Sequence, residues 1–382
     1  MKNFLIFFSI VLLIYAAINY YIFVRGYQSI PRESSLRTFY IFFFIFLASS
    51  YFIGRILEKY TLSIVSEFFM WIGAFWLAIM VYLFLSVLLL DLLRLTDHFT
   101  GIFPAYIKDN YSFVKQITAI LVIGITLTAV AAGRVNAVNP RVKKLSLRLE
   151  KNFNDGRPVR VFMASDVHLG TLISNSRLDH LIDQINAYNP DVVLFAGDLF
   201  DEDLGPVIKD NLGDQLRQIR SRYGVYAIMG NHEYYGGVSA ATRYMEDHGI
   251  TVLRDKAVKV NNSFYLIGRE DLTRNQVEKR ATLEKLTEQL DRSLPWVLMD
   301  HQPYHLEEAE KNGVDLQLSG HTHHGQLWPF NYITELVYEV SWGYKLKGNT
   351  HVYVSSGFGG WGPPIRLGNR PEVVEIELIP GK

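Results

Sequence analysis

The distribution of apolar residues divides the chain into two unlike parts. The first part contains four runs without a charged residue, at 4–24, 38–54, 68–90 and 116–133. A helix needs about 20 predominantly apolar residues to cross a bilayer. We therefore expect an all-α transmembrane region of about four helices over residues 1–135. The first run is longer than a signal-peptide core and ends without a small-residue cleavage site, so we expect it to be retained.

The second part of the chain alternates short apolar runs with polar segments. Residues 136–157 are basic and polar, and we interpret them as a linker into a domain over 158–382. Apolar periodicity predicts helices at 177–188, 212–221 and 240–247. The predicted strands lie at 161–165, 192–196, 225–229, 264–267, 296–299, 316–318, 352–354 and 373–378. Strands alternating with helices predict an α/β fold, and the scarcity of helices in the last third favours a mixed or double sheet.

The charged residues are also distributed unequally between the two parts of the chain. The first 140 residues hold 16 charged side chains and the remaining 242 hold 60. With four spans, eight basic residues fall on the side of the termini and six on the other. The positive-inside rule then predicts a multi-pass cell-membrane protein with its C-terminal domain in the cytoplasm. The formal net charge is zero, so we expect no nucleic-acid partner. The absence of cysteine excludes disulfides and thiolate metal sites.

Metal-binding side chains directly follow five of the predicted strands. They are Asp166 and His168; Asp198 and Asp201; Asn231, His232 and Glu233; Asp300 and His301; and His321, His323 and His324. Imidazole, carboxylate and amide donors without sulfur suit zinc, manganese or iron. The set is too large for one tetrahedral ion. It fits two divalent ions that share a carboxylate, as in phosphatases and nucleases.

The order of these motifs resembles the calcineurin-like metallophosphoesterase superfamily. The resemblance covers about 160–380 and implies an α/β four-layer domain, a mixed β-sandwich flanked by helices, with a dimetal site at the sheet rim. Gly-His-Thr-His-x-Gly-Gln at 320–326 and Arg-Leu-Gly-Asn-Arg-Pro-Glu at 366–372 are similar to a bacterial membrane-associated phosphodiesterase branch. That branch includes enzymes of the UDP-2,3-diacylglucosamine pyrophosphatase type. His324 departs from it, because the branch usually has glycine there.

The resemblance also implies roles for individual residues. One ion would be held by Asp166, His168 and His323. The other would be held by Asn231, His301 and His321, with Asp198 bridging the two. Catalysis would involve Asn231 and His232, with His232 protonating the leaving oxygen and a metal-bound hydroxide attacking the phosphorus.

Five further residues are candidates for supporting a ligand or touching the substrate: Asp201, Glu233, Asp300, His324 and Arg366. Asp201 suits the orientation of a ligand or a helix cap. Asp300 either bonds a ligand histidine or simply ends its strand. Arg366 suits a bound phosphate and a structural ion pair equally well.

Two segments of the domain have a distinctive composition. The segment 327–347 is rich in Trp and Tyr, and either docks on the bilayer, lines an acyl channel or packs on the sandwich. The segment 271–292 is charged, with apolar residues at helical spacing, and we interpret it as a solvated helix.

The function that fits these features is that of a membrane-anchored dimetal phosphohydrolase. Its substrate would carry a phosphodiester or pyrophosphate bond, in a lipid-linked molecule. The alternatives are a phosphatase or nuclease acting on a soluble substrate, and a non-catalytic membrane scaffold or sensor. The complete set of ligand positions favours catalysis.

Overall fold

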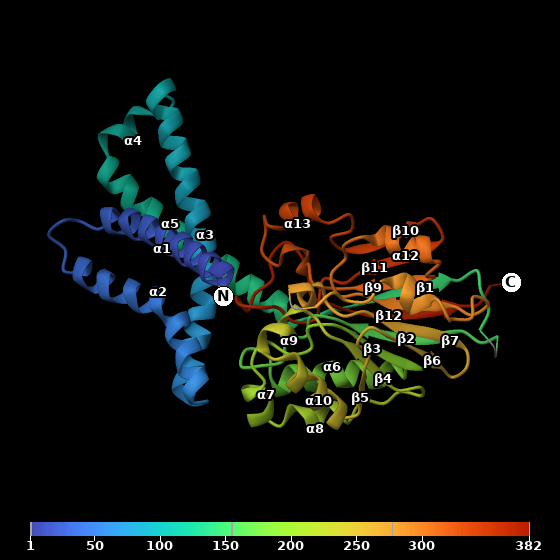
Figure 1. Ribbon diagram of the computed structural model, residues 1–382. Coiled ribbons are helices and arrows are strands. Elements are labelled where there is room, and N and C mark those ends of the chain that lie inside the picture. Colours follow the sequence, from blue (N-terminus) through green and yellow to red (C-terminus); the bar gives the residue numbers. More distant parts are fainter. Residues whose placement is uncertain (1, 154–155, 277, 382) are drawn as a thin grey trace. The chain divides into compact units, whose positions relative to one another are not determined.

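The computed structural model describes residues 2–153, 156–276 and 278–381. The chain forms two compact units (Figure 1). The helical unit comprises Met1–Gly133 together with Gly362–Ile365, and the α/β unit comprises Arg134–Trp361 together with Arg366–Lys382.

The helical unit contains the expected apolar helices. Its helices are α1 (Lys2–Ser29), α2 (Leu36–Tyr60), α3 (Ile64–Thr100), the short α4 (Ala105–Asp109) and α5 (Tyr111–Val138). Four of them are long and apolar enough to cross a membrane. The prediction of about four apolar helices is thus confirmed. Each helix extends beyond its uncharged run, because polar residues at the ends continue the helical turn.

The α/β unit contains two six-stranded sheets. The first has the order β1-β12-β2-β3-β4-β5 and the second has the order β10-β11-β9-β8-β7-β6. The strands of the first are β1 (Arg141–Arg148), β12 (Glu372–Ile379), β2 (Val159–Ala164), β3 (Val192–Ala196), β4 (Val225–Ile228) and β5 (Ile250–Val252). Those of the second are β10 (Gly343–Lys347), β11 (Thr350–Val354), β9 (Leu316–Ser319), β8 (Trp296–Met299), β7 (Phe264–Gly268) and β6 (Lys256–Val260). Both sheets mix parallel and antiparallel pairs.

Side chains that alternate between the two faces of each strand allow the sheets to pack on each other and on the outer helices, which gives four layers. In β2, Val161 and Met163 join the core between the sheets, while Phe162 and Ala164 join the core beneath the helices of the first sheet. Successive side chains of a strand point to opposite faces, so a strand buried on both faces is apolar throughout. The expected β-sandwich flanked by helices is confirmed.

Helices cover the outer face of each sheet. The first sheet packs against α6 (Asn175–Tyr188), α8 (Leu212–Leu216) and α10 (Val238–Asp247). The second packs against α11 (Leu283–Thr287) and α12 (Leu306–Asn312). The remaining short helices are α7 (Gly205–Lys209), α9 (Asn231–Gly236), α13 (Asn331–Val337) and two 3-10 turns at Leu272–Gln276 and His323–Gly325.

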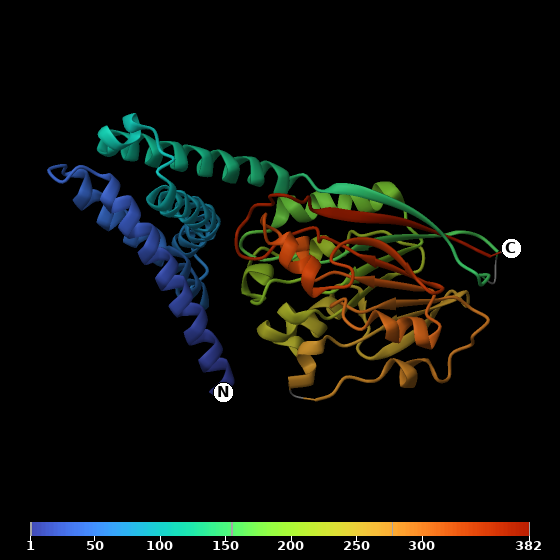
Figure 2. The same cartoon turned by 90° about the horizontal axis from the view of Figure 1, so that it is seen from above.

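The segment expected as a linker contains a strand. β1 pairs in parallel with β12, and Figure 2 shows the green strand running beside the red one. Leu145 and Leu147 of β1, and Leu149 just after it, contribute to the inter-sheet core. Such sparse apolar spacing, with Lys143 and Lys144 exposed, is typical of an edge strand.

Two helix predictions were too long. The segment 212–221 is helical only over Leu212–Leu216, and 271–292 holds a 3-10 turn and the five-residue α11. In the second case Leu283 and Leu290 pack on the sheet, so their helical spacing reflects core contacts made by a mostly irregular segment.

Candidate metal centre

The predicted ligand residues gather at the carboxyl ends of strands from both sheets. β2, β3 and β4 run parallel in the first sheet, and β8 runs parallel to β9 in the second. Parallel strands end at the same edge of a sheet, which is where α/β folds place their sites. The residues that follow these strands therefore meet on one rim.

One cluster unites Asp166, His168 and His323. The Nε2 atoms of the two histidines are 3.1 Å apart, and His323 Nε2 lies 3.4 Å from Asp166 Oδ1. Ligand atoms from all three lie within 4.8 Å of one another, so this group could hold an ion.

A second cluster unites Asp198, His301 and His321. His301 Nε2 lies 3.1 Å from Asp198 Oδ2, and Asn231 Oδ1 lies 2.8 Å from His321 Nδ1. The ligand atoms of Asp198, His301 and His321 also lie within 4.8 Å of one another. Asp198 Oδ2 is in addition 3.9 Å from His168 Nε2 of the first cluster, so its carboxylate lies between the two groups.

Buried polar atoms in these clusters support a metal site. Asp166 Oδ2 and His168 Nδ1 are buried and have no hydrogen-bond partner. A buried carboxylate oxygen without a partner is costly unless a ligand satisfies it. His301 Nδ1 lies 2.8 Å from the carbonyl oxygen of Ala196, so it donates there and leaves Nε2 free for an ion. The donor set therefore fits divalent metal ions.

The backbone around the clusters is strained and closely packed. Asp166, Asp198, His321 and His323 have φ values between 46° and 70°. Such left-handed conformations of non-glycine residues are costly and concentrate at functional sites. Gly320 has no room for a side chain, because a Cβ there would lie 2.2 Å from Asp166 Oδ2.

Burial keeps most of the histidines uncharged. It lowers the pKa of His168 to about 3 and that of His321 to about 4. Burial and the Arg366 guanidinium hold the pKa of His323 well below its ordinary value. Metal-binding imidazoles must be deprotonated, so these pKa values favour an ion. His301 differs, because the Asp198 carboxylate outweighs burial and raises its pKa.

His232 forms a third group with His168 and Asp198, whose ligand atoms lie within 4.8 Å of one another, and it has a carboxylate partner. Its backbone N–H donates to Asp198 Oδ1 at 2.9 Å, and its Nδ1 lies 3.1 Å from Asp201 Oδ1. Burial opposes the charged imidazole, but the hydrogen bond to Asp201 and the Asp198 charge raise its pKa to about 9. Asp201 is thus placed to orient the imidazole of His232.

Glu233 ties two of the loops together. Its carboxylate accepts hydrogen bonds from the backbone N–H groups of Gly230 at 2.8 Å, Phe200 at 2.9 Å and Asp198 at 3.2 Å. The side chain is buried and accepts all three of these hydrogen bonds, so it fixes the turns after β3 and β4 relative to each other.

Arg366 lies behind His323. Its Nη1 donates to the His323 carbonyl oxygen at 2.8 Å, and its Nη2 lies 2.9 Å from His323 Nδ1. Only 1% of the side chain is exposed. Arg366 therefore supports a candidate ligand through hydrogen bonds and does not present its guanidinium to a substrate.

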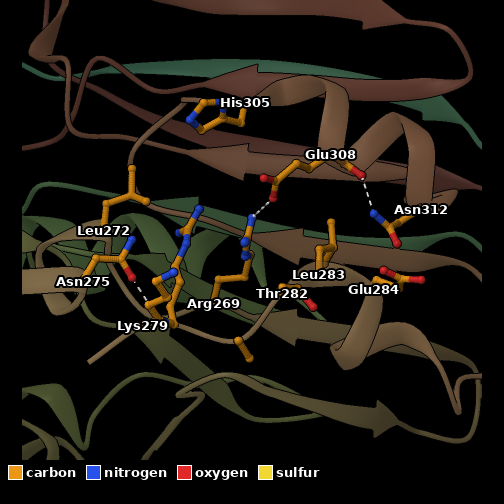
Figure 3. Close-up of a pocket in the computed structure, with 12 residues that line it drawn as sticks. Arg269, Leu272, Asn275, Lys279, Thr282, Leu283, Glu284, His305, Glu308 and Asn312 are labelled. Carbon is orange, nitrogen blue, oxygen red and sulfur yellow. Dashed lines mark hydrogen bonds and ion pairs between the residues drawn. The ribbon is translucent and has the colours of Figure 1, made fainter. Parts of the chain in front are cut away.

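Asp300 points away from the ion clusters and supports the strand end from behind. Its oxygens accept from Arg269 Nη1 at 3.1 Å and Arg280 Nη1 at 2.8 Å. These two arginines border a cavity of about 490 Å³, where Arg269 also pairs with Glu308 (Figure 3). Among the described residues, none of those in the ion clusters lines this cavity.

His324 is also directed away from the clusters. Its Nδ1 lies 3.0 Å from Ser341 Oγ, and its Nε2 lies 3.7 Å from a carboxylate oxygen of Glu335 on α13. The extra imidazole therefore connects the histidine loop to α13.

The sequence analysis missed Asp271. This residue follows β7 and is 1% exposed, and both of its oxygens lie 2.9 Å from Gln302 Nε2. Its charge acts on His301 and His321. A signal was present, because an apolar strand leads into Gly-Arg-Glu-Asp as other strands lead into ligands.

Comparison with known proteins agrees with this geometry. The calcineurin-like phosphoesterase family model matches residues 159–325. An uncharacterized metallophosphoesterase of Campylobacter jejuni is 30% identical over 385 residues, covering 98% of both chains. The chain belongs to the calcineurin-like metallophosphoesterase family. Its four apolar helices therefore precede a metallophosphoesterase domain.

Other relatives match mainly this domain. An uncharacterized metallophosphoesterase of Helicobacter pylori is 31% identical over 63% of this chain and 64% of its own length. A transmembrane protein with metallophosphoesterase domain from Danio rerio is 32% identical over 67% of this chain and 62% of its own. The chain thus spans less than two thirds of the length of these two relatives.

Proposed function

We propose that the protein is a membrane-anchored dimetal phosphohydrolase that cleaves a phosphodiester or pyrophosphate bond. The observation that carries this proposal is the pair of His/Asp clusters, with the Asp198 carboxylate between them. Two divalent ions at such a site supply charge to the phosphate and activate water.

The ligand assignment follows the two clusters. Asp166, His168 and His323 would hold one ion, and Asn231, His301 and His321 would hold the other. Asp198, whose carboxylate lies between the two groups, would serve both ions. Manganese, zinc and iron all suit these donors. Two observations support this assignment: Asp166 Oδ2 is buried without a hydrogen-bond partner, and His301 Nδ1 donates to the carbonyl oxygen of Ala196.

His232 serves as the general acid. Its raised pKa keeps the imidazole protonated at neutral pH, and its bond to Asp201 fixes Nδ1 and directs Nε2 outward. The proton then passes from Nε2 to the leaving oxygen of the substrate. Asn231 sits beside it at the start of α9 and acts through its amide oxygen.

The substrate is lipid-linked and the domain faces the cytoplasm. Four apolar helices would concentrate the enzyme at a cell membrane. The motifs at 320–326 and 366–372 resemble enzymes that cleave UDP-2,3-diacylglucosamine. This resemblance makes nucleotide-linked diacyl pyrophosphates the first substrates to test.

Hydrolysis of bis-p-nitrophenyl phosphate by the full-length protein in detergent tests the activity. The protein would be stripped of metal, reloaded with Mn²⁺, Zn²⁺ or Fe²⁺, and compared with Asp198→Asn. Turnover that needs metal and is lost in the variant is expected. Two bound ions without turnover on soluble or lipid substrates would instead indicate a scaffold or sensor. A preference for soluble phosphomonoesters or nucleic acid would indicate that the substrate is not lipid-linked.

A further inference from the structure

Five apolar side chains are exposed on the helix α13 (Figure 1) and at Trp328, three residues before it. We call this group the interfacial patch; it consists of Trp328, Tyr332, Ile333, Leu336 and Val337. Their exposed fractions range from 48% for Trp328 to 88% for Leu336, and none of the seven residues of α13 is buried. Exposed apolar groups of this kind mark interaction surfaces.

The other side of α13 is attached to the domain by polar contacts. Ser341 Oγ donates to Thr334 Oγ1 at 2.8 Å, and the hydroxyls of Tyr304 and Tyr338 lie 3.2 Å apart. The backbone of Asn331 lies so close to Gly325 that a Cβ on this glycine would lie 2.3 Å from it. The helix is therefore held in place with its apolar side chains turned outward.

A lipid surface is the occupant that suits this patch. Trp and Tyr together with aliphatic side chains favour the boundary between headgroups and acyl chains. Four helices of the same chain are long and apolar enough to cross a bilayer, so a bilayer is always within reach. A stable protein interface takes about 20–30 residues from each partner, far more than these five. A small patch suffices for lipid contact, because tethering to the bilayer raises its effective concentration.

The patch is connected to the metal centre. α13 begins seven residues after His324, and the ring of Tyr338, which directly follows this helix, lies 6.2 Å from that of His321. Glu335 of α13 lies 3.7 Å from His324. A surface bound by α13 would therefore lie next to the histidine loop.

We infer that the interfacial patch inserts into the headgroup region of the bilayer and brings the histidine loop to the lipid surface. This inference deepens the proposed function and rests on it for the lipid substrate. The docking itself does not depend on turnover.

The depth of a spin label tests the docking directly. The chain has no cysteine, so Leu336→Cys in the full-length protein can be labelled at one position. Ile208→Cys is the matched control, because Ile208 is also an exposed aliphatic residue, at 58%, outside the patch. Both proteins would be placed in nanodiscs of phosphatidylethanolamine and phosphatidylglycerol, and relaxation by oxygen and by a water-soluble nickel chelate would be measured.

The inference expects the label at 336 to be accessible to oxygen and shielded from nickel, and the label at 208 to be accessible to nickel. Nickel access at 336 equal to that at 208 would overturn the inference. Shielding of 336 from both reagents would also overturn it, by indicating a protein partner such as a second copy. A lipid-like depth of the label at both positions would also overturn the inference, because docking would then not be a property of the interfacial patch.

A second pair of variants separates docking from catalysis. Leu336→Glu is expected to lower hydrolysis of vesicle-borne UDP-2,3-diacylglucosamine about tenfold and to leave bis-p-nitrophenyl phosphate hydrolysis unchanged. Ile208→Glu should change neither. Equal losses on both substrates would contradict docking. If the wild-type protein hydrolyses neither substrate, the proposed function fails, whereas the label depth, repeated with Asp198→Asn, still decides the docking.

Discussion

In the helical unit, the carboxylate of Asp91 on α3 has a partner at each oxygen. Oδ2 lies 2.7 Å from Arg25 Nη2 and accepts from the Tyr21 hydroxyl, while Oδ1 lies 3.1 Å from Arg94 Nη1. In the candidate metal centre, Asp166 Oδ1 accepts from the His321 backbone N–H at 2.9 Å, but the buried Oδ2 has no hydrogen-bond partner. A paired carboxylate stabilises the fold, whereas a carboxylate left unsatisfied reduces stability until a ligand binds. The contrast distinguishes structural polar groups from ligand-binding ones.

On the metal-centre side of this contrast, Asp198→Asn is expected to have the largest effect. Loss of the central negative charge should reduce bound metal and lower turnover by about a thousandfold. Metal content by mass spectrometry and bis-p-nitrophenyl phosphate hydrolysis measure the two effects. Asp214→Asn, in an exposed position on α8, is the control. Full metal content in Asp198→Asn would contradict the bridging role.

His232→Ala should separate metal binding from proton transfer. The variant is expected to keep its ions and to lose about a hundredfold in rate on alkyl phosphodiesters, which have poor leaving groups. Esters of p-nitrophenol should be affected much less, because p-nitrophenolate leaves without a proton. His180→Ala, on an exposed face of α6, serves as the control. Loss of metal from His232→Ala would make this residue a ligand.

Asp91→Asn should lower the stability of the protein without changing its metal content. Removing the charge leaves Arg25 and Arg94 without an ionic partner, so the free energy of unfolding should fall by about 1–3 kcal/mol. Thermal unfolding in detergent, followed by circular dichroism, measures this loss. The metal content of the α/β unit should be unchanged, and a reduced metal content would show that Asp91 is not purely structural.

Asp201→Asn is expected to have the smallest effect, visible as a shift in pH dependence. His232 acts in its protonated form, so the rate on poor leaving groups should fall as pH rises through its pKa of about 9. Because Asp201 raises this pKa, the variant should lose activity at lower pH than the wild type. An unchanged alkaline limb would mean that His232 is not the acid.

The sequence by itself determined the features that depend on local pattern. Runs without charge predict membrane helices because their composition decides the transfer from water to lipid. The gathering of the candidate ligand residues was predictable because each follows an apolar strand, and parallel strands deliver their carboxyl ends to one rim. Seven predicted ligand residues, from Asp166 to His323, therefore lie together in the structure.

Only the tertiary structure decided features that depend on distant partners. β1 is recognisable only through β12, whose residues follow it by 231 positions. The orientation of Asp300 and of Arg366 depends on which groups pack behind them, and the role of Asp271 depends on Gln302. α13 contains the same kinds of apolar residues as a core helix, and its exposure reflects the absence of a covering element among the described residues of its unit. Burial is a property of what surrounds a side chain, so residue type and spacing could not fix it.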